Sequence, residues 1–407
     1  MNTLSLPRLA SAALARHLRA MPVTVLSGAR QTGKSTLAHV AGDPQRQFLT
    51  LDDPSVAELA ERDPGALLAG DAPITIDEVQ LAPRLLRAVK QAVDRKRIKG
   101  RALLTGSANL LTMANVTESL AGRASYLTLW PMTRREQRGR GRAGLWDELL
   151  AAGDADWMEL AGTDAEGSED WRALARRGGF PTPALQLSSA EERSIWFEGY
   201  VRTYLERDLR ALSNVASLPD FRRLMRAAAL RIGQLVNQAE IGRDVGIPQP
   251  TVHRHLNLLE TSYMLVRVPA FAANRTTRLI KTPKLYWSDP GLALHLAGSP
   301  EPGGQHLESI VLHDLLAWRD AQLRRSEVCY WRTPAGAEVD FVLESDDRLL
   351  PIEVKATARP GINDTAGLRA FREAHAKRSR PGLLLHCGTE TAWILPGILA
   401  TPWWRVV

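Results

Sequence analysis

An eight-residue run, GARQTGKS from Gly28 to Ser35, constrains the fold of this chain more than any other feature. Its glycines allow the backbone to turn tightly and to point successive N–H groups into one concave surface. Residues 23–27 before the run read as a short buried strand, and residues 36–40 after it can open a helix. Because a loop of this sequence between a strand and a helix holds the phosphates of a nucleotide, we predict a P-loop in an α/β domain.

The residues of this loop have separate predicted roles in binding ATP. Gly28 and Gly33 keep the main chain close to the phosphates, and Lys34 reaches the β- and γ-phosphates. The Ser35 hydroxyl suits Mg²⁺, which prefers oxygen ligands in octahedral geometry. Thr36 follows at the start of the expected helix and is assigned to the same nucleotide site. The alternative is a glycine turn that carries a surface lysine.

A second apolar strand, over residues 73–78, ends in two carboxylates. We predict that Asp77 holds magnesium through water and that Glu78 orients the water that attacks the γ-phosphate. This pair favours hydrolysis of the nucleotide over binding alone. The alternative is that both side chains only cap a helix over residues 80–93.

Two further segments add polar residues to the predicted site. A strand over residues 101–104 leads to Ser107, our candidate for a γ-phosphate sensor, with Asn109 as second choice. The alternative there is a turn rich in glycine and serine. Farther along, Arg123 follows a glycine that should end a short helix. We predict that Arg123 enters the site of a neighbouring subunit as an arginine finger, and the alternative is a surface salt bridge.

The middle of the chain changes character twice. Five arginines between residues 134 and 142 form a basic, glycine-rich stretch. We interpret it as a surface excursion that is either solvated or in contact with a phosphate backbone. Apolar and aromatic residues then recur at helical spacing over 191–212, with Tyr200 and Tyr204 near one face. This segment is predicted to pack as core or as a helical lid.

Residues 234–267 read as two short helices about a turn at Gly246. In a helix-turn-helix, the second helix presents its first polar residues to the major groove of DNA. Here these are Gln249, Thr251, His253, Arg254 and His255. A basic wing against DNA phosphates is predicted from Arg275, Arg278, Lys281 and Lys284. The alternative is a winged helix used for packing or subunit contact.

Carboxylates recur in the C-terminal region at positions that the expected elements bring together. A helix over 305–319 bears Glu308, and two of the strands that follow carry Asp340 and the pair Glu353 and Lys355. On adjacent strands, Asp340 and Glu353 can chelate one Mg²⁺, and Lys355 can stabilise a pentavalent phosphate or position the attacking water. The alternative is a structural salt-bridge network.

Composition sets the outer limits. A chain of 407 residues is too long for one ordinary core, so several domains are expected. The net charge of +7 favours anionic partners such as nucleic acid. Two cysteines provide neither a disulfide framework nor a metal cluster and suit a reducing compartment. Because there is no long apolar run and the N-terminus reads as an amphipathic helix, we expect a cytoplasmic protein without a membrane partner.

Five segments, in order and spacing, resemble AAA-type ATPases of bacteria and archaea that carry a characteristic C-terminal domain of unknown function. They are GARQTGKST, LTLDDP, ITIDEVQ, LLTGSAN and SLAGRASYLTLWPM, and the resemblance extends to NRTTRLIKTPKLYWSDPGLALHL. It implies an oligomeric, commonly ring-forming ATPase with the roles given above for Lys34, Ser35, Asp77, Glu78, Ser107 and Arg123. Ser107 departs from the pattern, because AAA sensors are more usually asparagine.

The last hundred or so residues resemble the restriction-endonuclease-like PD-(D/E)xK superfamily, through Glu308 and the segments VDFVLE and IEVKAT. The resemblance implies a domain that cuts DNA or docks on it. The implied catalytic set is Glu308, Asp340, Glu353 and Lys355. Val339 stands where the nominal motif has proline.

We therefore expect an α/β chain of four parts: a P-loop ATPase core (1–136), a linker and helical lid (137–215), a winged helix-turn-helix (216–285) and an endonuclease-like domain (286–407). The expected function is ATP-driven remodelling or processing of duplex or branched DNA, as in repair or recombination, with magnesium-dependent cleavage left open. One alternative is a nucleotide-dependent DNA-binding switch in defence or transcription. Another is an ATPase scaffold for a protein partner.

Overall fold

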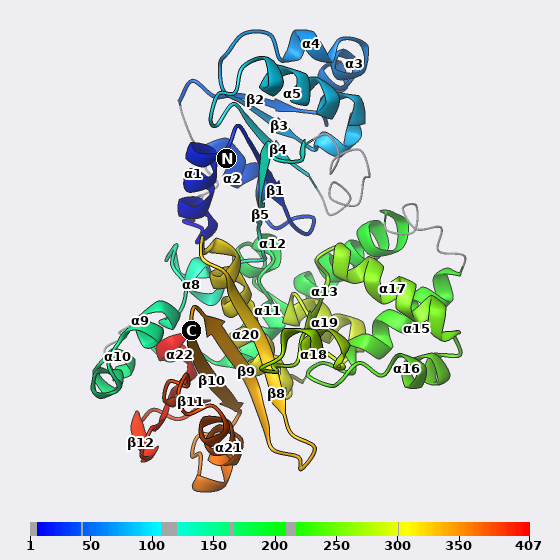
Figure 1. The fold of residues 1–407 in the computed structure, drawn as a ribbon. Coiled ribbons are helices and arrows are strands. Elements are labelled where there is room, and N and C mark those ends of the chain that lie inside the picture. The colour runs from blue at the N-terminus through cyan, green and yellow to red at the C-terminus, as the bar shows by residue number, and fades with distance from the viewer. Residues whose placement is uncertain (1–5, 42–43, 107–119, 163–166, 209–216, 300) are drawn as a thin grey trace.

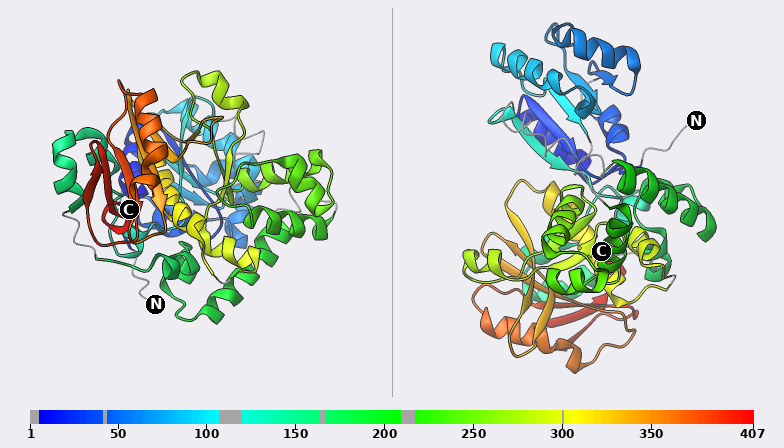
Figure 2. Two further views of the ribbon diagram at one scale, coloured as in Figure 1. Left: turned by 90° about the horizontal axis from the view of Figure 1, so that it is seen from below. Right: turned by 90° about the vertical axis from the view of Figure 1, so that its right-hand side faces the viewer.

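The computed structural model describes residues 6–41, 44–106, 120–162, 167–208, 217–299 and 301–407. These residues form a mixed α/β fold with a five-stranded sheet, a six-stranded sheet and one pair of short strands. The five-stranded sheet lies at one end of the molecule, and the six-stranded sheet lies at the other (Figures 1 and 2). The α/β fold class is therefore confirmed.

The first sheet is fully parallel and has the order β2-β3-β4-β1-β5. Strand β1 precedes the glycine-rich loop, and β3 leads to the two carboxylates. Strand β4 lies between them in the sheet. The three strands predicted in this region are present. The bounds are β1 Val23–Ser27, β2 Gln47–Thr50, β3 Ile74–Asp77, β4 Ala102–Thr105 and β5 Ala124–Thr128.

Side chains that alternate along these strands supply two cores, one on each face of the sheet. Leu26 and Leu103 belong to the core under α1 and α2. Val25 and Leu104 belong to the opposite core, which includes residues of α3 and α5. The covering helices are α1 Ala10–Ala20, α2 Lys34–Val40, α3 Pro54–Arg62, α4 Pro64–Leu67 and α5 Pro83–Arg95, with a 3₁₀ turn, η1, at Val79–Leu81.

The middle region is mostly helical. A long helix was predicted over 191–212. The structure has α13 over Ala190–Tyr200, and this helix continues as a π-helix, η3, over Val201–Asp208. Tyr200 and Tyr204 are buried, in agreement with the packing prediction. The other helices are α8 Arg134–Gln137, α9 Trp146–Ala151, α10 Trp157–Gly162, α11 Trp171–Arg177, α12 Pro181–Leu185 and α15 Leu218–Ala229, with a 3₁₀ turn, η2, at Asp154–Asp156.

Two short helices with a tight turn follow, as the sequence predicts. Helix α16 spans Gln238–Val245 and α17 spans Gln249–Thr261. Gly246 ends α16 with φ at 70°, a left-handed conformation that favours glycine. Two antiparallel strands come next, β6 Leu265–Val268 and β7 Lys284–Trp287, with α18 Arg275–Ile280 between them.

The second sheet has the order β12-β13-β11-β10-β9-β8 and mixes parallel and antiparallel pairs. Helix α20 precedes its first three strands, which form an antiparallel meander, and α21 connects β10 to its parallel neighbour β11. The bounds are α19 Pro290–Ala297, α20 Gly304–Ala321, β8 Ser326–Arg332, β9 Glu338–Ser345, β10 Arg348–Lys355, η4 Ile362–Thr365, α21 Ala366–Ala374, β11 Gly382–His386, β12 Ala392–Leu395, β13 Ile398–Pro402 and α22 Trp403–Val406.

One hydrophobic core runs through the middle region and the C-terminal sheet. It includes Trp157 and Phe221 from the middle helices together with Leu312 of α20 and Phe341 of β9. Strand β8 also joins the β6–β7 pair, through a bridge between Ala270 and Tyr330. The middle region therefore packs on the C-terminal sheet as part of a single core. No helix in the described part of the chain is both long enough and apolar enough to cross a bilayer.

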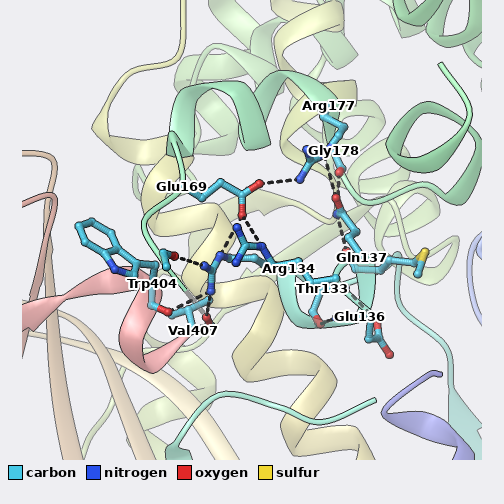
Figure 3. Close-up of polar contacts among 12 residues, drawn as sticks. Thr133, Arg134, Glu136, Gln137, Glu169, Arg177, Gly178, Trp404 and Val407 are labelled. Carbon is cyan, nitrogen blue, oxygen red and sulfur yellow. Dashed lines mark hydrogen bonds and ion pairs between the residues drawn. The ribbon is translucent and has the colours of Figure 1, made fainter. Parts of the chain in front are cut away.

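The start of the basic stretch at 134–142 contradicts the prediction of a surface excursion. Arg134 and Arg135 are buried, at 2% and 0% exposure. As Figure 3 shows, the Arg134 guanidinium donates to the main-chain oxygens of Trp404 and Val407, at 2.9 Å each, and pairs with Glu169 at 3.0 Å. These arginines therefore hold the C-terminal segment in place, because five guanidinium donors can satisfy several oxygens at once.

This network predicts a large loss of stability for Arg134→Ala. The substitution removes the donor to the main-chain oxygens of Trp404 and Val407 and one of the three arginines that pair with Glu169. Removing one member of such a buried network costs about 3–5 kcal/mol. Urea unfolding followed by circular dichroism measures the shift in midpoint. The control is Arg62→Ala, which removes a solvent-exposed pair with Glu58 and should leave the midpoint unchanged. Equal midpoints for both variants would contradict the assignment.

Candidate functional site

The strand ends that the sequence singled out meet at one edge of the parallel sheet. Since all five strands run in the same direction, Ser27, Asp77 and Thr105 end β1, β3 and β4 on the same side. The glycine-rich loop leaves β1 at this edge and leads into α2. The predicted meeting of the loop and the two carboxylates is therefore confirmed.

The loop has backbone angles that only particular residues tolerate. Gly28 has φ at 144°, and a Cβ atom there would lie 2.3 Å from the Leu129 carbonyl oxygen. Gly33 has φ at 93°. Gln31 is also left-handed, with φ at 61°, which is uncommon for a residue other than glycine and recurs at functional sites. Gly28 is thus required by close approach of two main-chain segments.

Lys34 is buried in this loop, which excludes the alternative of a surface lysine. Its ammonium donates to the carbonyl oxygens of Gly28, at 3.2 Å, and Ala29, at 2.6 Å. Burial lowers the pKa of Lys34 to about 8, and the charges of Glu78 and Asp77 partly oppose this shift. A positive charge is therefore held under the loop, with two carboxylates near it.

Asp77 is the centre of a polar group at the strand ends. The Ser35 hydroxyl donates to its carboxylate at 3.1 Å, and the Thr105 hydroxyl donates to the same oxygen. A serine hydroxyl beside a carboxylate is a set of oxygen donors that suits Mg²⁺, so these residues fit the predicted ion. Their mutual hydrogen bonds hold them at the mouth of the loop.

Glu78 follows in a left-handed conformation, with φ at 56°. Its main-chain N–H points to the Thr105 hydroxyl at 3.4 Å, and its carboxylate accepts a hydrogen bond from the Gln80 side chain. Neither carboxylate caps the next helix: α5 begins after Ala82, and no side chain caps it or the 3₁₀ turn before it. The capping alternative is therefore wrong.

A cavity of about 450 Å³ opens beside the loop. Gly33 and Thr36 line it from the loop and α2, and the N-terminal segment and α12 close it from two other sides. Apolar side chains form much of its wall. The lining is completed by Leu6, Pro7, Arg8, Ser11, Leu37, Val40, Met132, Pro181, Leu185 and Gln186.

Three further residues were predicted to belong to the site: Ser107, Asn109 and Arg123. Ser107, and Asn109 with it, lies outside the described residues. Arg123 lies just before β5, at the opposite edge of the sheet from the loop that follows β1. It pairs with Asp94 at 2.6 and 3.0 Å, the surface salt bridge of the alternative prediction. Its role as a finger toward a neighbouring subunit stays a prediction.

Three residues that shape the site were given no role by the sequence analysis. Arg8 donates to the Thr32 carbonyl of the loop at 2.8 Å and to the Trp130 carbonyl at 2.7 Å. Thr105 and Gln80 hydrogen-bond the two carboxylates. A signal existed for Thr105, since it is the polar end of an apolar strand. Arg8 has no local signal, because its partners are remote in sequence.

The residues predicted to face DNA divide into two groups. Gln249, His253 and Arg254 are exposed on the first half of α17, and Thr251 is half-buried. His255 is wrong as a groove-facing residue, because it is 2% exposed and its ring packs edge-on against Phe221. Burial lowers the pKa of His255, which keeps its ring neutral in this core.

The predicted basic wing is also largely wrong. Arg278 is buried and pairs with Glu327 at 2.9 Å and with Glu344. Lys284 is buried and turns toward carboxylates of the C-terminal sheet. Lys281 is exposed, and the Arg275 side chain lies outside the described part of the chain. Ala270, in the connection between β6 and β7, bridges to Tyr330 of β8. This region therefore packs on the C-terminal sheet, which is the packing role of the alternative prediction.

The C-terminal carboxylates do converge, as predicted. Asp340 of β9 accepts a hydrogen bond from the Val354 main chain at 3.0 Å, and Lys355 pairs with Glu353 at 2.6 Å. Tyr286 donates to Glu308 at 2.8 Å. Burial, reinforced by the charge of Asp340, raises the pKa of both Glu308 and Glu353.

Two lysines pair with members of this carboxylate cluster, which does not fit a metal centre as it stands. The Lys284 ammonium lies 3.5 Å from Asp340 and pairs with Glu338, so a protein cation already stands beside the carboxylate predicted to bind magnesium. The described residues contain no group of three or more His, Cys, Asp or Glu side chains arranged to hold a metal ion. One Glu353 oxygen is buried without a hydrogen-bond partner among them.

Comparisons with known proteins divide the chain into three matched parts. Residues 20–137 match a model described as an AAA domain. Residues 168–302 match a domain of unknown function, DUF8612, and residues 303–406 match another, DUF4143. The parallel sheet and its loop therefore fit a P-loop NTPase core of the AAA class.

Two curated mycobacterial proteins are similar over nearly the whole chain. They are the uncharacterized protein Rv2008c of Mycobacterium tuberculosis and the uncharacterized protein Mb2031c of Mycobacterium bovis. Each is 32% identical over 366 residues, which cover 87% of this chain and 75% of the relative. The chain belongs to the family of these two proteins, and its residues 20–137 carry the AAA-domain match.

A solved structure of a RuvB variant from Thermotoga maritima aligns with 64% of this chain and 88% of its own, at 16% identity and a TM-score of 0.28.

The buried ammonium predicts that nucleotide affinity depends on pH. Bound phosphate favours charged Lys34, so its pKa rises in the complex, and affinity should fall by roughly tenfold per pH unit above the free value near 8. Fluorescence titration with a labelled ATP, between about pH 7 and about pH 9.5, measures this fall. In Glu78→Gln the fall should begin at lower pH, because one charge that raises the Lys34 pKa is gone. A flat profile would contradict the prediction.

Proposed function

We propose that this chain binds and hydrolyses ATP at the edge of its parallel sheet. The observation that carries the proposal is that Lys34, Ser35, Asp77 and Glu78 come together there from a glycine loop and a second strand. Membership of an AAA-domain family supports it. Binding alone would not need a carboxylate beyond the one next to Ser35, so Glu78 favours hydrolysis.

The side chains have different roles in this proposal: phosphate binding, metal binding and orientation of the attacking water. Lys34 neutralises phosphate oxygens, and the loop N–H groups bind them. Ser35 and Asp77 hold Mg²⁺, which supplies positive charge to the triphosphate when bound. Glu78 accepts a hydrogen bond from the attacking water and orients it, once its carboxylate leaves Gln80.

The cavity beside the loop is the place for the nucleoside. Its apolar wall suits a flat base, and Thr36 and Gln186 offer polar groups within it. Gly33 belongs to the loop and also lines the cavity, so a nucleotide can place its phosphates in the loop and its base in the cavity. The N-terminal segment and α12 then act as the base-binding walls. The described helices between residues 137 and 208, α12 among them, form the proposed lid.

Ring-like self-association and DNA binding complete the proposal. Arg123 acts as an arginine finger in the site of a neighbouring subunit. It precedes β5 and so lies at the opposite end of the strands from the loop of its own subunit. Exposed Gln249, His253 and Arg254 on α17 form the DNA-reading group, supported by the two helices about the turn at Gly246 and by the net charge of +7. ATP turnover then remodels or processes duplex or branched DNA. A nucleotide-dependent DNA-binding switch uses the same residues.

Cleavage of DNA is not part of this proposal. Helix α20 and the strands β8 to β11 have the order that the PD-(D/E)xK resemblance implies, and Glu308, Asp340, Glu353 and Lys355 converge on it. Lys284 nevertheless stands beside Asp340, and Lys355 is paired with Glu353, so protein cations already occupy the carboxylates predicted to bind the metal. The domain serves better as a packing and docking platform.

Two substitutions separate binding from hydrolysis. Lys34→Ala should abolish ATP binding, because it removes the positive charge that the loop holds for phosphate. Glu78→Gln should retain binding and reduce turnover at least about a hundredfold, because it keeps shape but loses the base. Phosphate release and equilibrium dialysis measure the two properties. Hydrolysis by Glu78→Gln at the parental rate would show that Glu78 does not orient the water.

If α17 binds DNA, replacing its exposed basic residues should weaken DNA affinity in a salt-dependent way. The double variant His253→Ala, Arg254→Ala should weaken duplex affinity by roughly tenfold and reduce the slope of affinity against salt by about one. Fluorescence anisotropy at several salt concentrations measures both. Arg325→Ala is the matched control, since Arg325 is also exposed but lies at the C-terminal sheet. Equal affinities for the two variants would contradict DNA binding through α17.

A further inference from the structure

Two tyrosines of the middle region contact the P-loop and the strand residue that precedes it. The Tyr263 hydroxyl is hydrogen-bonded to the Ser27 hydroxyl at 2.9 Å, and Ser27 is the last residue of β1 before the loop. The Tyr200 hydroxyl donates to the Arg30 carbonyl, inside the loop, at 3.3 Å. Both contacts are long-range in sequence.

The two contacts join at one short segment. Tyr200 also lies 3.8 Å from the sulfur of Met264, the residue after Tyr263. Met264 is fully buried, and its carbonyl accepts a hydrogen bond from Ser288 at 2.9 Å, next to the end of β7. The segment is therefore tied both to the loop and to the β6–β7 pair.

This segment is also the connection between α17 and β6. Tyr263 has φ at 58°, the left-handed region, and its N–H bonds the Glu260 carbonyl at 2.9 Å. Its ring packs edge-on against Trp130, which follows β5. A bulky residue in this conformation costs free energy and persists only where its surroundings hold it. Here the surroundings are the end of β1 and the residues after β5.

Building on the proposed function, we propose that Tyr263 and Tyr200 are positioning residues that couple occupancy of the P-loop to the placement of α17. When the loop main chain closes on phosphates, Ser27 and Arg30 move with it, and the tyrosine hydroxyls carry that movement to Met264 and to the end of α17. Because coupling between two sites is reciprocal, a ligand on α17 should change nucleotide affinity by the same factor.

Hydrogen–deuterium exchange of the full chain, with and without Mg²⁺ and a non-hydrolysable ATP analogue, tests this coupling. In the parental protein, nucleotide should slow exchange in the loop and change exchange in α17. Tyr263→Phe keeps the ring and removes the hydroxyl, so the change in α17 should shrink by roughly two- to tenfold while the loop remains protected. Tyr330→Phe is the control, because its hydroxyl donates to a main-chain carbonyl, that of Thr282, away from the loop.

The outcomes are distinct. A normal response of α17 in Tyr263→Phe, with a protected loop, overturns the coupling and leaves the proposed ATPase intact. Absence of loop protection in the parental protein overturns both. Equal losses in Tyr263→Phe and Tyr330→Phe show a general loosening and overturn the specific role of Tyr263.

Discussion

The site depends on the hydrogen bonds that the Asp77 carboxylate accepts. Asp77 ends one strand and accepts hydrogen bonds from Ser35, at the start of α2, and from Thr105, at the end of the neighbouring strand. Three segments that are remote in sequence are thereby fixed at one edge. The parallel direction of the strands makes this possible, since all their carboxyl ends lie together. Lys34 and Glu78 are placed by the same arrangement.

The rest of the molecule is connected to that edge through specific contacts. The middle region and the C-terminal sheet share one hydrophobic core. Arg134 ties the C-terminal segment to the end of the AAA-matched part, and Tyr263 ties α17 to the strand before the loop. A change at the loop therefore has physical routes to regions far away in sequence. Such routes suit a protein whose nucleotide state alters another surface.

Local pattern predicted much of the fold and of the nucleotide site. The strand before Gly28, the strand that ends at Asp77 and the helix pair about Gly246 are all where hydrophobic spacing and glycine placed them. These features depend on neighbours within a few residues. Lys284 and His255 were wrongly predicted to be exposed, because their burial depends on residues that are remote in sequence. Near a basic run or a helix start, a polar side chain is normally expected to face solvent. Their partners, Asp340 and Phe221, come from other elements. Nothing local reveals them.

A structure of the full chain with Mg²⁺ and a non-hydrolysable ATP analogue tests the central claim most directly. The account predicts the triphosphate inside the loop from Gly28 to Ser35, with Lys34 on its phosphates and the metal bound to the Ser35 hydroxyl. The base should lie in the cavity lined by Thr36 and Leu185. A nucleotide bound elsewhere on the chain, or none at saturating concentration, would contradict it.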